Sequence, residues 1–245
     1  MIIDAHGHIG MFNSWPLAKG RPNNVVNILR NEGIDYVLVS SAKAIAYDCP
    51  SGNAEVLEAA AEYKEIIPML CINPQRPEEA VTELSTRQAR GFVGVKMHPS
   101  SHEYSLTSPA ARAVLELCEE SQVPVLTHSS EDDPGCGPQA IATVAERHPD
   151  LLLIVGHACL FSSREVVDVA EEYPNVYLEL SVNYEAAKLE DTIERLGCGR
   201  LLFGSDVPLH NPSVMVQCVK VIGLPKEEED KILCENARRL FQLSV

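Results

Sequence analysis

The feature that most constrains this chain is a regular alternation of short apolar runs with longer amphipathic stretches. The apolar runs are nearly continuous in Val, Ile and Leu, and eight of them follow one another: 1–8, 35–41, 66–73, 92–98, 123–129, 151–158, 176–181 and 200–206. Such runs are typical of strands buried on both faces of a parallel sheet. The stretches between them have helical periodicity, and we expect helices over 23–33, 53–65, 77–91, 108–122, 138–150, 163–175, 186–197 and 226–243.

Strand followed by helix, repeated eight times in 245 residues, predicts an α/β fold closed into a (β/α)₈ TIM barrel. An open doubly wound sheet is the alternative. It usually has fewer strands, and no G-x-G-x-x-G motif follows the first apolar run here. The chain has no linker, low-complexity tract or charge block, so we expect residues 1–245 to form a single domain.

Composition narrows the environment and the partners. No apolar run reaches the roughly 18 residues that a membrane span requires, and the N-terminus lacks the pattern of a signal peptide, so we expect a cytoplasmic protein. A net charge of −15 argues against nucleic acid as a partner and leaves a small-molecule substrate. Eight scattered cysteines without a C-x-x-C pair predict free, mostly buried thiols.

Polar residues recur at the ends of the apolar runs. In a barrel of this kind, side chains at the carboxyl ends of the strands form the active site. A polar group in such a place is costly to bury unless it has a partner. The ionisable residues that stand out at these ends are His6 and His8, Lys96 and His98, His128, His157, and Asp206.

His6 and His8 are the strongest candidates for metal ligands. They are two residues apart, so both rings point to the same side of a strand. Two neutral imidazoles on one face can share a metal ion, although a pair of hydrogen-bonded barrel histidines would show the same spacing. His128 and Asp206 would add a third nitrogen and a carboxylate, and a position would remain for water.

Lys96 allows two functional interpretations. As an ammonium group it would hold a substrate carboxylate or stabilise developing negative charge. Carboxylated by carbon dioxide, it would become an anionic bridge between two metals. A solvent-facing lysine is the remaining alternative, although the residue lies in an apolar run.

Other polar residues have less definite expected positions. His98 and His102 either line the mouth of the barrel, where His98 would contact the substrate, or lie on solvated loops. Alternation alone does not decide whether Glu179 and Ser181, at the end of the seventh run, reach the site. His148 and His210 are expected on the surface.

Substrate contacts are expected in the loops after the strands, because such loops commonly carry specificity. Segment 9–22 holds Trp15, the only tryptophan, together with Arg21, and segment 41–52 holds Tyr47. Simple loop packing is the alternative for each of these three residues.

Several stretches together resemble a known family. They are IIDAHGHIG, GFVGVKMHP, VPVLTHSS, IVGHA, LLFGSDVP and ENARRLF, and they run in order from residue 2 to residue 241. The sequence resembles the amidohydrolase superfamily, and within it the amidohydrolase 2 branch. That branch includes aminocarboxymuconate-semialdehyde decarboxylase and related aromatic-acid decarboxylases and hydratases. The resemblance implies a distorted (β/α)₈ barrel.

The resemblance also implies a ligand set. His6, His8, His128 and Asp206 would surround a divalent metal, usually zinc, and His157 would be a second-metal ligand or a catalytic histidine. Lys96 stands on the strand that carries the carboxylated lysine of two-metal members, but in this branch that lysine often stays unmodified. One or two ions, and a homo-oligomer such as a dimer, are therefore expected.

The function predicted first is a metal-dependent hydrolase, in which a metal-activated water cleaves an amide, ester or lactone bond of a small molecule. Asp206 would be the general base, and His157 or Lys96 would stabilise the oxyanion. The alternative is a metal-dependent decarboxylase, other lyase or hydratase that acts on an unsaturated or aromatic carboxylic acid. A metal-binding barrel without catalytic activity is the third hypothesis.

Overall fold

The computed structural model describes residues 1–11, 20–158 and 163–245. Its eight strands lie at or very near the eight predicted runs. They are β1 (Ile3–Ile9), β2 (Tyr36–Ser41), β3 (Ile66–Ile72), β4 (Gly94–Met97), β5 (Val125–Thr127), β6 (Leu153–Val155), β7 (Val176–Glu179) and β8 (Leu201–Leu202). Every neighbouring pair is parallel, and the strands follow one another in sequence order from β1 to β8.

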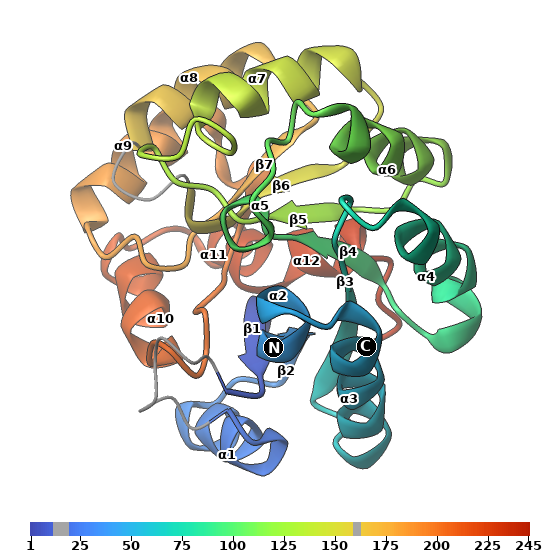
Figure 1. Ribbon diagram of the computed structural model, residues 1–245. Coiled ribbons are helices and arrows are strands. Elements are labelled where there is room, and N and C mark those ends of the chain that lie inside the picture. The colour runs from blue at the N-terminus through green and yellow to red at the C-terminus, as the bar shows by residue number, and fades with distance from the viewer. Residues whose placement is uncertain (12–19, 159–162) are drawn as a thin grey trace.

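The sheet closes where the chain after β8 meets β1. Ala5 N donates to the carbonyl of Phe203 (2.9 Å) and His8 N to that of Val207 (2.7 Å). Asp206 N donates in return to the carbonyl of His6 (2.8 Å). The predicted (β/α)₈ barrel is therefore confirmed, with its closure made by irregular backbone beyond a two-residue strand (Figure 1).

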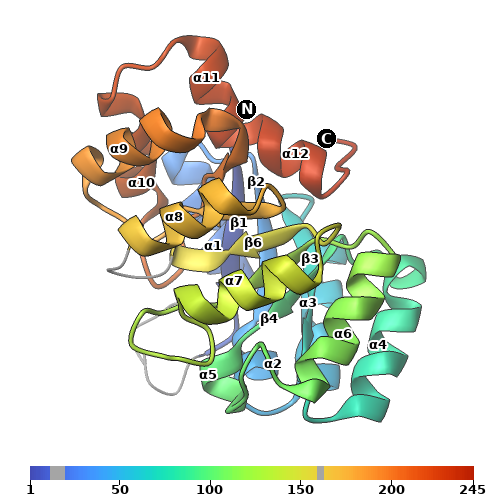
Figure 2. The ribbon, with the colours of Figure 1, turned by 90° about the horizontal axis from the view of Figure 1, so that it is seen from above.

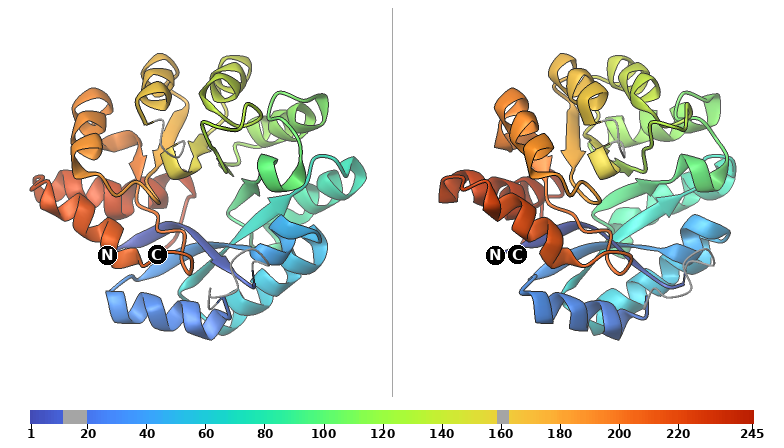
Figure 3. Two further views of the ribbon diagram at one scale, coloured as in Figure 1. Left: turned by 60° about the vertical axis from the view of Figure 1, so that its left-hand side comes forward. Right: turned by 90° about the vertical axis from the view of Figure 1, so that its left-hand side faces the viewer.

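An outer ring of helices surrounds the barrel (Figures 1 and 3). It consists of α1 (Pro22–Glu32), α3 (Cys49–Glu62), α4 (Pro77–Arg90), α6 (Pro109–Glu120), α7 (Pro138–Arg147), α8 (Ser163–Glu172), α9 (Ala186–Leu196) and α10 (Pro212–Val221). Most begin with proline in the first turn, which suits a position that has no hydrogen-bond partner for its N–H. Helices α1 and α4 end at the left-handed glycines Gly33 (φ 71°) and Gly91 (φ 92°).

One helix was missed and another is irregular. Helix α10 was not predicted, because apolar residues such as Val214 and Val221 also lie on its exposed face and obscure the helical spacing of its buried residues. The helix expected over 226–243 is present without a break as α11 (Lys226–Asp230), a π-helical turn η3 (Lys231–Glu235) and α12 (Asn236–Leu240), and it ends three residues early. The short helices α2 (Ala42–Ala46) and α5 (Pro99–His102) and the 3₁₀ turns η1 (Gly156–Ala158) and η2 (Cys198–Arg200) complete the structure as described.

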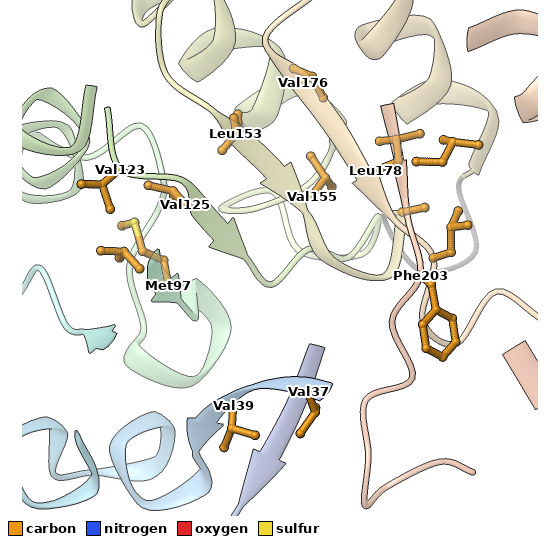
Figure 4. Close-up of a cluster of buried hydrophobic side chains, with 14 of the residues drawn as sticks. Val37, Val39, Met97, Val123, Val125, Leu153, Val155, Val176, Leu178 and Phe203 are labelled. Carbon is orange, nitrogen blue, oxygen red and sulfur yellow. The ribbon is translucent and has the colours of Figure 1, made fainter. Parts of the chain in front are cut away.

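Two apolar clusters hold the layers together. The larger lies between the outer side of the strands and the helices, and Figure 4 shows its side chains on β2 and on β4 to β7. The smaller lies inside the barrel, where Leu38 and Met69 pack with Leu240 and Phe241 of the C-terminal segment. Figure 2 shows α12 at one end of the barrel and α2 and α5 at the other. The C-terminal segment thus closes the amino end of the barrel and leaves the carboxyl end for a site.

Two expectations about position can be checked here. His148 was expected on the surface but is buried, because it ends α7 facing α6 and its Nδ1 lies 2.9 Å from Glu119 Oε2. His210 is half-buried, with its ring 5.8 Å from that of Tyr184. No helix in the described part of the chain is both long and apolar enough to cross a membrane.

Candidate metal centre

The inner face of the barrel changes character along its length. Near the amino ends of the strands it is apolar, and at the carboxyl ends it becomes polar. Strand register places paired residues on the same side, so Lys96 shares the inner face with Cys71, and His8 shares it with Ser40. The polar inner residues at this end are His6, His8, Ser40, Cys71, Lys96, His128, His157, Glu179 and Asp206.

A bulge in β1 decides which way its histidines point. Ile3 and Ala5 belong to the inner apolar cluster, so strict alternation would turn His6 and His8 outward. Register shifts between Asp4, paired with Val37, and Gly7, paired with Val39, which leaves Ala5 and His6 together opposite one residue. This extra residue returns both histidines to the inner face.

Asp4 holds the bulge in place. Its Oδ1 accepts hydrogen bonds from His6 N (3.0 Å) and Ser205 N (3.0 Å), and its Oδ2 accepts one from Ser205 Oγ. The carboxyl is fully buried, and burial raises its pKa to about 7. The acidic residue before the His-Gly-His motif therefore links β1 to the segment that carries Asp206.

The glycines beside the site residues are required by packing. A Cβ at Gly7, between the two histidines, would lie 2.5 Å from Val37 Cγ2. A Cβ at Gly156 would lie 2.8 Å from Thr127 O, and one at Gly204 would lie 2.0 Å from Glu179 Oε1. The small residues of HGH, VGHA and FGSD thus leave room for the neighbouring strand or for the buried Glu179.

His6 and His8 are oriented by groups behind them. His6 Nδ1 lies 2.6 Å from Glu179 Oε2, and His8 Nδ1 lies 3.0 Å from Ser40 Oγ and 3.3 Å from Ser40 O. A carboxylate and a carbonyl only accept, so each ring carries a hydrogen on Nδ1, and His6 presents the lone pair of its Nε2. The Nε2 of His8 faces the carboxylate of Asp206. Metal-binding histidines show this arrangement, in which the other ring nitrogen donates to a carboxylate or a carbonyl.

Asp206 completes a compact donor set. Its Oδ1 lies 3.0 Å from His8 Nε2 and 3.8 Å from His6 Nε2, and donor atoms of these three buried residues all lie within 4.8 Å of one another. Burial alone would raise the pKa of Asp206, but the hydrogen bond from His8 and the nearby imidazoles hold it well below its usual range. The carboxyl group is thus ionised and available as a ligand or as a base.

His157 and His128 lie beside this set. His157 adopts a left-handed conformation (φ 61°), and its Nδ1 lies 2.8 Å from Ser181 Oγ. Its ring centroid is 4.8 Å from that of His6 and 5.1 Å from that of His128. His98 stacks on His128 at 4.1 Å. Burial lowers the pKa of His157 and of His98 well below the usual value and that of His128 to about 4, so these rings are neutral at neutral pH.

Lys96 points into the same cluster. Its side chain is almost fully buried, and Nζ lies 2.8 Å from His6 Nε2. An ammonium group only donates, so this contact shows that the lone pair of His6 Nε2 faces a cation. Burial lowers the pKa of Lys96 to about 8, although Asp206 and Glu179 act in the opposite direction. The alternative of a solvent-facing lysine was wrong.

These residues fit a divalent metal. Two imidazoles and an ionised carboxylate form the compact set, and further imidazoles lie close by. Such a mixed nitrogen and oxygen set suits a borderline cation such as zinc or manganese. Glu179 also stands at the end of an apolar strand, as the other polar residues of the cluster do. Only the folded barrel shows that its carboxylate contacts the ring of His6.

The expected substrate contacts fall in different places. His98 lies against the cluster, as its stacking on His128 shows. Tyr47 is 60% exposed and lines a neighbouring pocket of about 550 Å³, whose lining in the described chain includes no member of the cluster. Arg21 is exposed directly before α1. Trp15 lies outside the described residues.

Comparison with known proteins establishes the family. The family model described as amidohydrolase matches residues 3–243, and the chain therefore belongs to this family. This confirms the resemblance seen in the sequence. A search of curated proteins finds no match.

Several solved structures share the fold. 2,6-Dihydroxybenzoate decarboxylase from Rhizobium is 19% identical, with a TM-score of 0.76 over 100% of this chain and 98% of that one. 5-Carboxyvanillate decarboxylase from Sphingomonas paucimobilis is 15% identical, with a TM-score of 0.74 over 99% of both chains. Dihydroxybenzoic acid decarboxylase from Polaromonas sp. JS666, with bound manganese and 2-nitroresorcinol, is 18% identical, with a TM-score of 0.73 over 100% and 97%.

Proposed function

We propose that the protein is a metal-dependent decarboxylase that releases carbon dioxide from a small unsaturated or aromatic carboxylic acid. The observation that carries this proposal is the buried Lys96 ammonium within the set of metal ligands. Lys96 places a buried positive charge inside a chain whose net charge is −15. A fixed positive charge at this point favours an anionic group on the substrate.

The environment of Lys96 supports a carboxylate partner. Its hydrogen-bond partner is the neutral ring of His6, and no carboxylate in the described residues forms an ion pair with it. Asp206 and Glu179 stabilise this charge from beyond ion-pair distance, and burying a charge without a directly paired opposite charge is costly. A substrate that enters the mouth of the barrel would supply the opposite charge through its carboxylate, and Lys96 would hold that end of the substrate.

The ligand set adds to this recognition. His6, His8 and Asp206 would hold the metal, with His128 and His157 at its side. When bound, the metal supplies Lewis acidity that fixes and polarises a substrate oxygen. The manganese in the Polaromonas decarboxylase supports a divalent ion of this kind. We propose one ion in this set rather than a carboxylated bridge between two, because the proposed recognition of the substrate carboxylate requires Lys96 as an ammonium group.

Asp206 is the proposed proton carrier. In decarboxylation the bond between the carboxyl carbon and its neighbour breaks, carbon dioxide leaves, and the electron pair stays on the substrate carbon. A proton must then reach that carbon. Asp206 is ionised, so it takes a proton from solvent or from the substrate and delivers it there. His157, fixed by Ser181, would orient the substrate beside it.

Hydrolysis is the second candidate, and the ionised Asp206 favours it. A carboxylate hydrogen-bonded to His8 and next to a metal set is placed to accept a proton from water. An amide, ester or lactone would then be the substrate. The decarboxylase is preferred because it gives the buried Lys96 a role and because the named structural neighbours are decarboxylases.

The test separates the two reactions directly. Protein loaded with Mn²⁺ or Zn²⁺ is incubated in D₂O with a panel of aromatic and unsaturated acids and, separately, with amides, esters and lactones. We expect release of carbon dioxide and a product that carries one deuterium at the carbon that lost the carboxyl group. Hydrolytic turnover without carbon dioxide release would overturn the proposal.

Lys96 provides the matched variant. Lys96→Met should lower kcat/KM for the best acid by about 100- to 1,000-fold, since it removes a fixed charge that faces the substrate. Lys64→Met, at an exposed position, should leave it unchanged. Equal activity of the two variants would show that Lys96 does not recognise the carboxylate.

A further inference from the structure

A second group of metal-ligating side chains lies near the candidate metal centre and shares no residue with it. Cys49, Cys71 and His102 are all buried, and their ligand atoms lie within 4.8 Å of one another. They come from the first residue of α3, the carboxyl end of β3 and the last residue of α5. Only the folded barrel brings these three segments together.

His102 presents a lone pair to this group. Its Nε2 lies 3.1 Å from the carbonyl of Ala44, and a carbonyl only accepts, so Nε2 carries the hydrogen and Nδ1 carries the lone pair. Nδ1 is buried and has no hydrogen-bond partner in the described part of the chain. A metal-binding histidine commonly donates its other ring nitrogen to a backbone carbonyl in this way. A buried acceptor without a partner is also rare enough to need a cause.

The two sulfurs lie close enough to share a cation. The Cys49 thiol donates to the carbonyl of Ala44 (3.4 Å), the same carbonyl that His102 Nε2 contacts. Loss of the proton gives the thiolate, which is the form that binds metals. Ala44 and Ile45 pack around the sulfurs and give the negative charge an apolar setting. A cation would offset the cost of burying it.

A fourth polar group stands close by. The hydroxyl of Tyr104 is also buried and has no hydrogen-bond partner among the described residues, and its ring centroid lies 6.4 Å from that of His102. Two buried polar side chains without a hydrogen-bond partner in the described chain, His102 and Tyr104, thus lie next to each other. Native interiors rarely leave such groups together without a ligand or water.

We propose that Cys49, Cys71 and His102 form a second metal site, which takes a thiophilic divalent cation and zinc in particular. Two thiolates and one imidazole are ligands typical of zinc, with a fourth position left for water or another oxygen. Binding forms two sulfur bonds and one nitrogen bond to the ion and releases the two thiol protons to solvent. No electron transfer is involved.

This second site lies beside the set of His6, His8 and Asp206, and this affects how the metal content of the protein is interpreted. Cys71 pairs with Lys96 across β3 and β4, on the same inner face. A metal analysis that finds two ions per chain would therefore not require a carboxylated Lys96. The site also ties β3 to α3 and α5 at the mouth, so ion binding should stabilise these segments. The inference is independent of the reaction proposed above.

Cobalt is the probe that distinguishes the two sites. Protein prepared without oxygen and with reductant is stripped with a chelator and titrated with Co²⁺. Thiolate-bound cobalt gives an intense charge-transfer absorption in the near ultraviolet, and the set of His6, His8 and Asp206 contains no sulfur. We expect this band in the wild-type protein, and its absence would overturn the proposal.

Variants assign the band to its ligands. Cys49→Ser and Cys71→Ser should each abolish or strongly weaken it and lower the zinc content by one ion per chain. Cys118→Ser, at an equally buried cysteine on α6, should keep it, and so should His8→Ala, which removes a ligand of the other set. A band that persists in Cys71→Ser would contradict the assignment.

A further measurement keeps the proposal falsifiable if a cysteine variant fails to fold. His102→Gln leaves both thiols in place and should weaken Co²⁺ binding at least about tenfold, because it removes one ligand of three. Thiol counting after exposure to air tests the competing idea of a redox pair. If two thiols are lost to a disulfide and no cobalt–thiolate band is seen, the two cysteines form a redox pair and the metal site is refuted.

Discussion

The two ends of the barrel use the same inner face of the same strands for opposite purposes. At the amino end, Leu38 and Met69 meet Leu240 and Phe241 of the C-terminal segment, and the interior is filled by apolar packing. At the carboxyl end, one or two residues further along each strand, imidazoles, a lysine and carboxylates occupy equivalent positions. No helix plugs this end in the described chain; the short α2 and α5 lie beside it (Figure 2).

The two ends differ in how burial changes the free energy of their side chains. Apolar residues at the amino end gain free energy by leaving water and need only the right volume. Polar residues at the carboxyl end lose free energy on burial and need specific partners, as His6 needs Glu179 and His8 needs Ser40. Damage at one end should therefore affect stability, and damage at the other should affect chemistry.

The largest effect is expected at the chemical end. Asp206→Asn should lower kcat for the best substrate by about 100- to 10,000-fold, because the amide cannot carry the proton. Thermal stability should change little. Steady-state kinetics, together with metal content and a melting curve, check this expectation, and turnover like that of the wild type would remove Asp206 from the mechanism.

The apolar end should respond in the opposite way. Phe241→Ala should lower the free energy of unfolding by about 3–5 kcal/mol, because it leaves a cavity in the apolar cluster at the amino end of the barrel. The Phe241 ring fills the space above Gly94, where a Cβ would lie 2.8 Å from it. Urea unfolding measures the loss, and metal affinity should be unchanged.

Val245→Ala, at an exposed position in the same C-terminal segment, is the control and should stay within about 0.5 kcal/mol of wild type. A large fall in metal affinity for Phe241→Ala would show that the two ends are not independent.

Gly204→Ala tests whether the space beside Glu179 is needed for both stability and metal binding. The added Cβ would lie 2.0 Å from Glu179 Oε1, so the carboxylate must move away from His6. We expect a loss of about 1–3 kcal/mol in unfolding free energy. Metal binding should weaken in the same variant. Gly199→Ala is the matched control, because a Cβ there has nothing within 4 Å, and an equal effect in both would refute the steric explanation.

The smallest effect is expected from Glu179→Gln, which keeps the size of the side chain and removes its charge. Metal affinity should fall about 10- to 100-fold, as for other residues that support a metal-binding histidine. Competition with a chelator measures it. Stability in the absence of metal should change far less than in Phe241→Ala, and unchanged affinity would mean that Glu179 only fills space.

The sequence made much of this architecture predictable. Eight apolar runs, each followed by a helical stretch, led to the number, order and direction of the strands. His6, His8, Lys96, His128 and Asp206 could be singled out because each interrupts an apolar strand at the same end. Each of these features belongs to one short segment, so it can be recognised in the sequence without knowing what the segment contacts.

The tertiary structure decided what depends on contacts between distant segments. Alternation from Ile3 and Ala5 turns His6 outward, and only the bulge held by Asp4 and Ser205 reverses this. Glu179 lies 173 residues from the ring that it orients. Cys49, Cys71 and His102 have no spacing that marks them as a group. Periodicity fixes which residues a strand offers, whereas long-range packing and hydrogen bonding fix which of them meet.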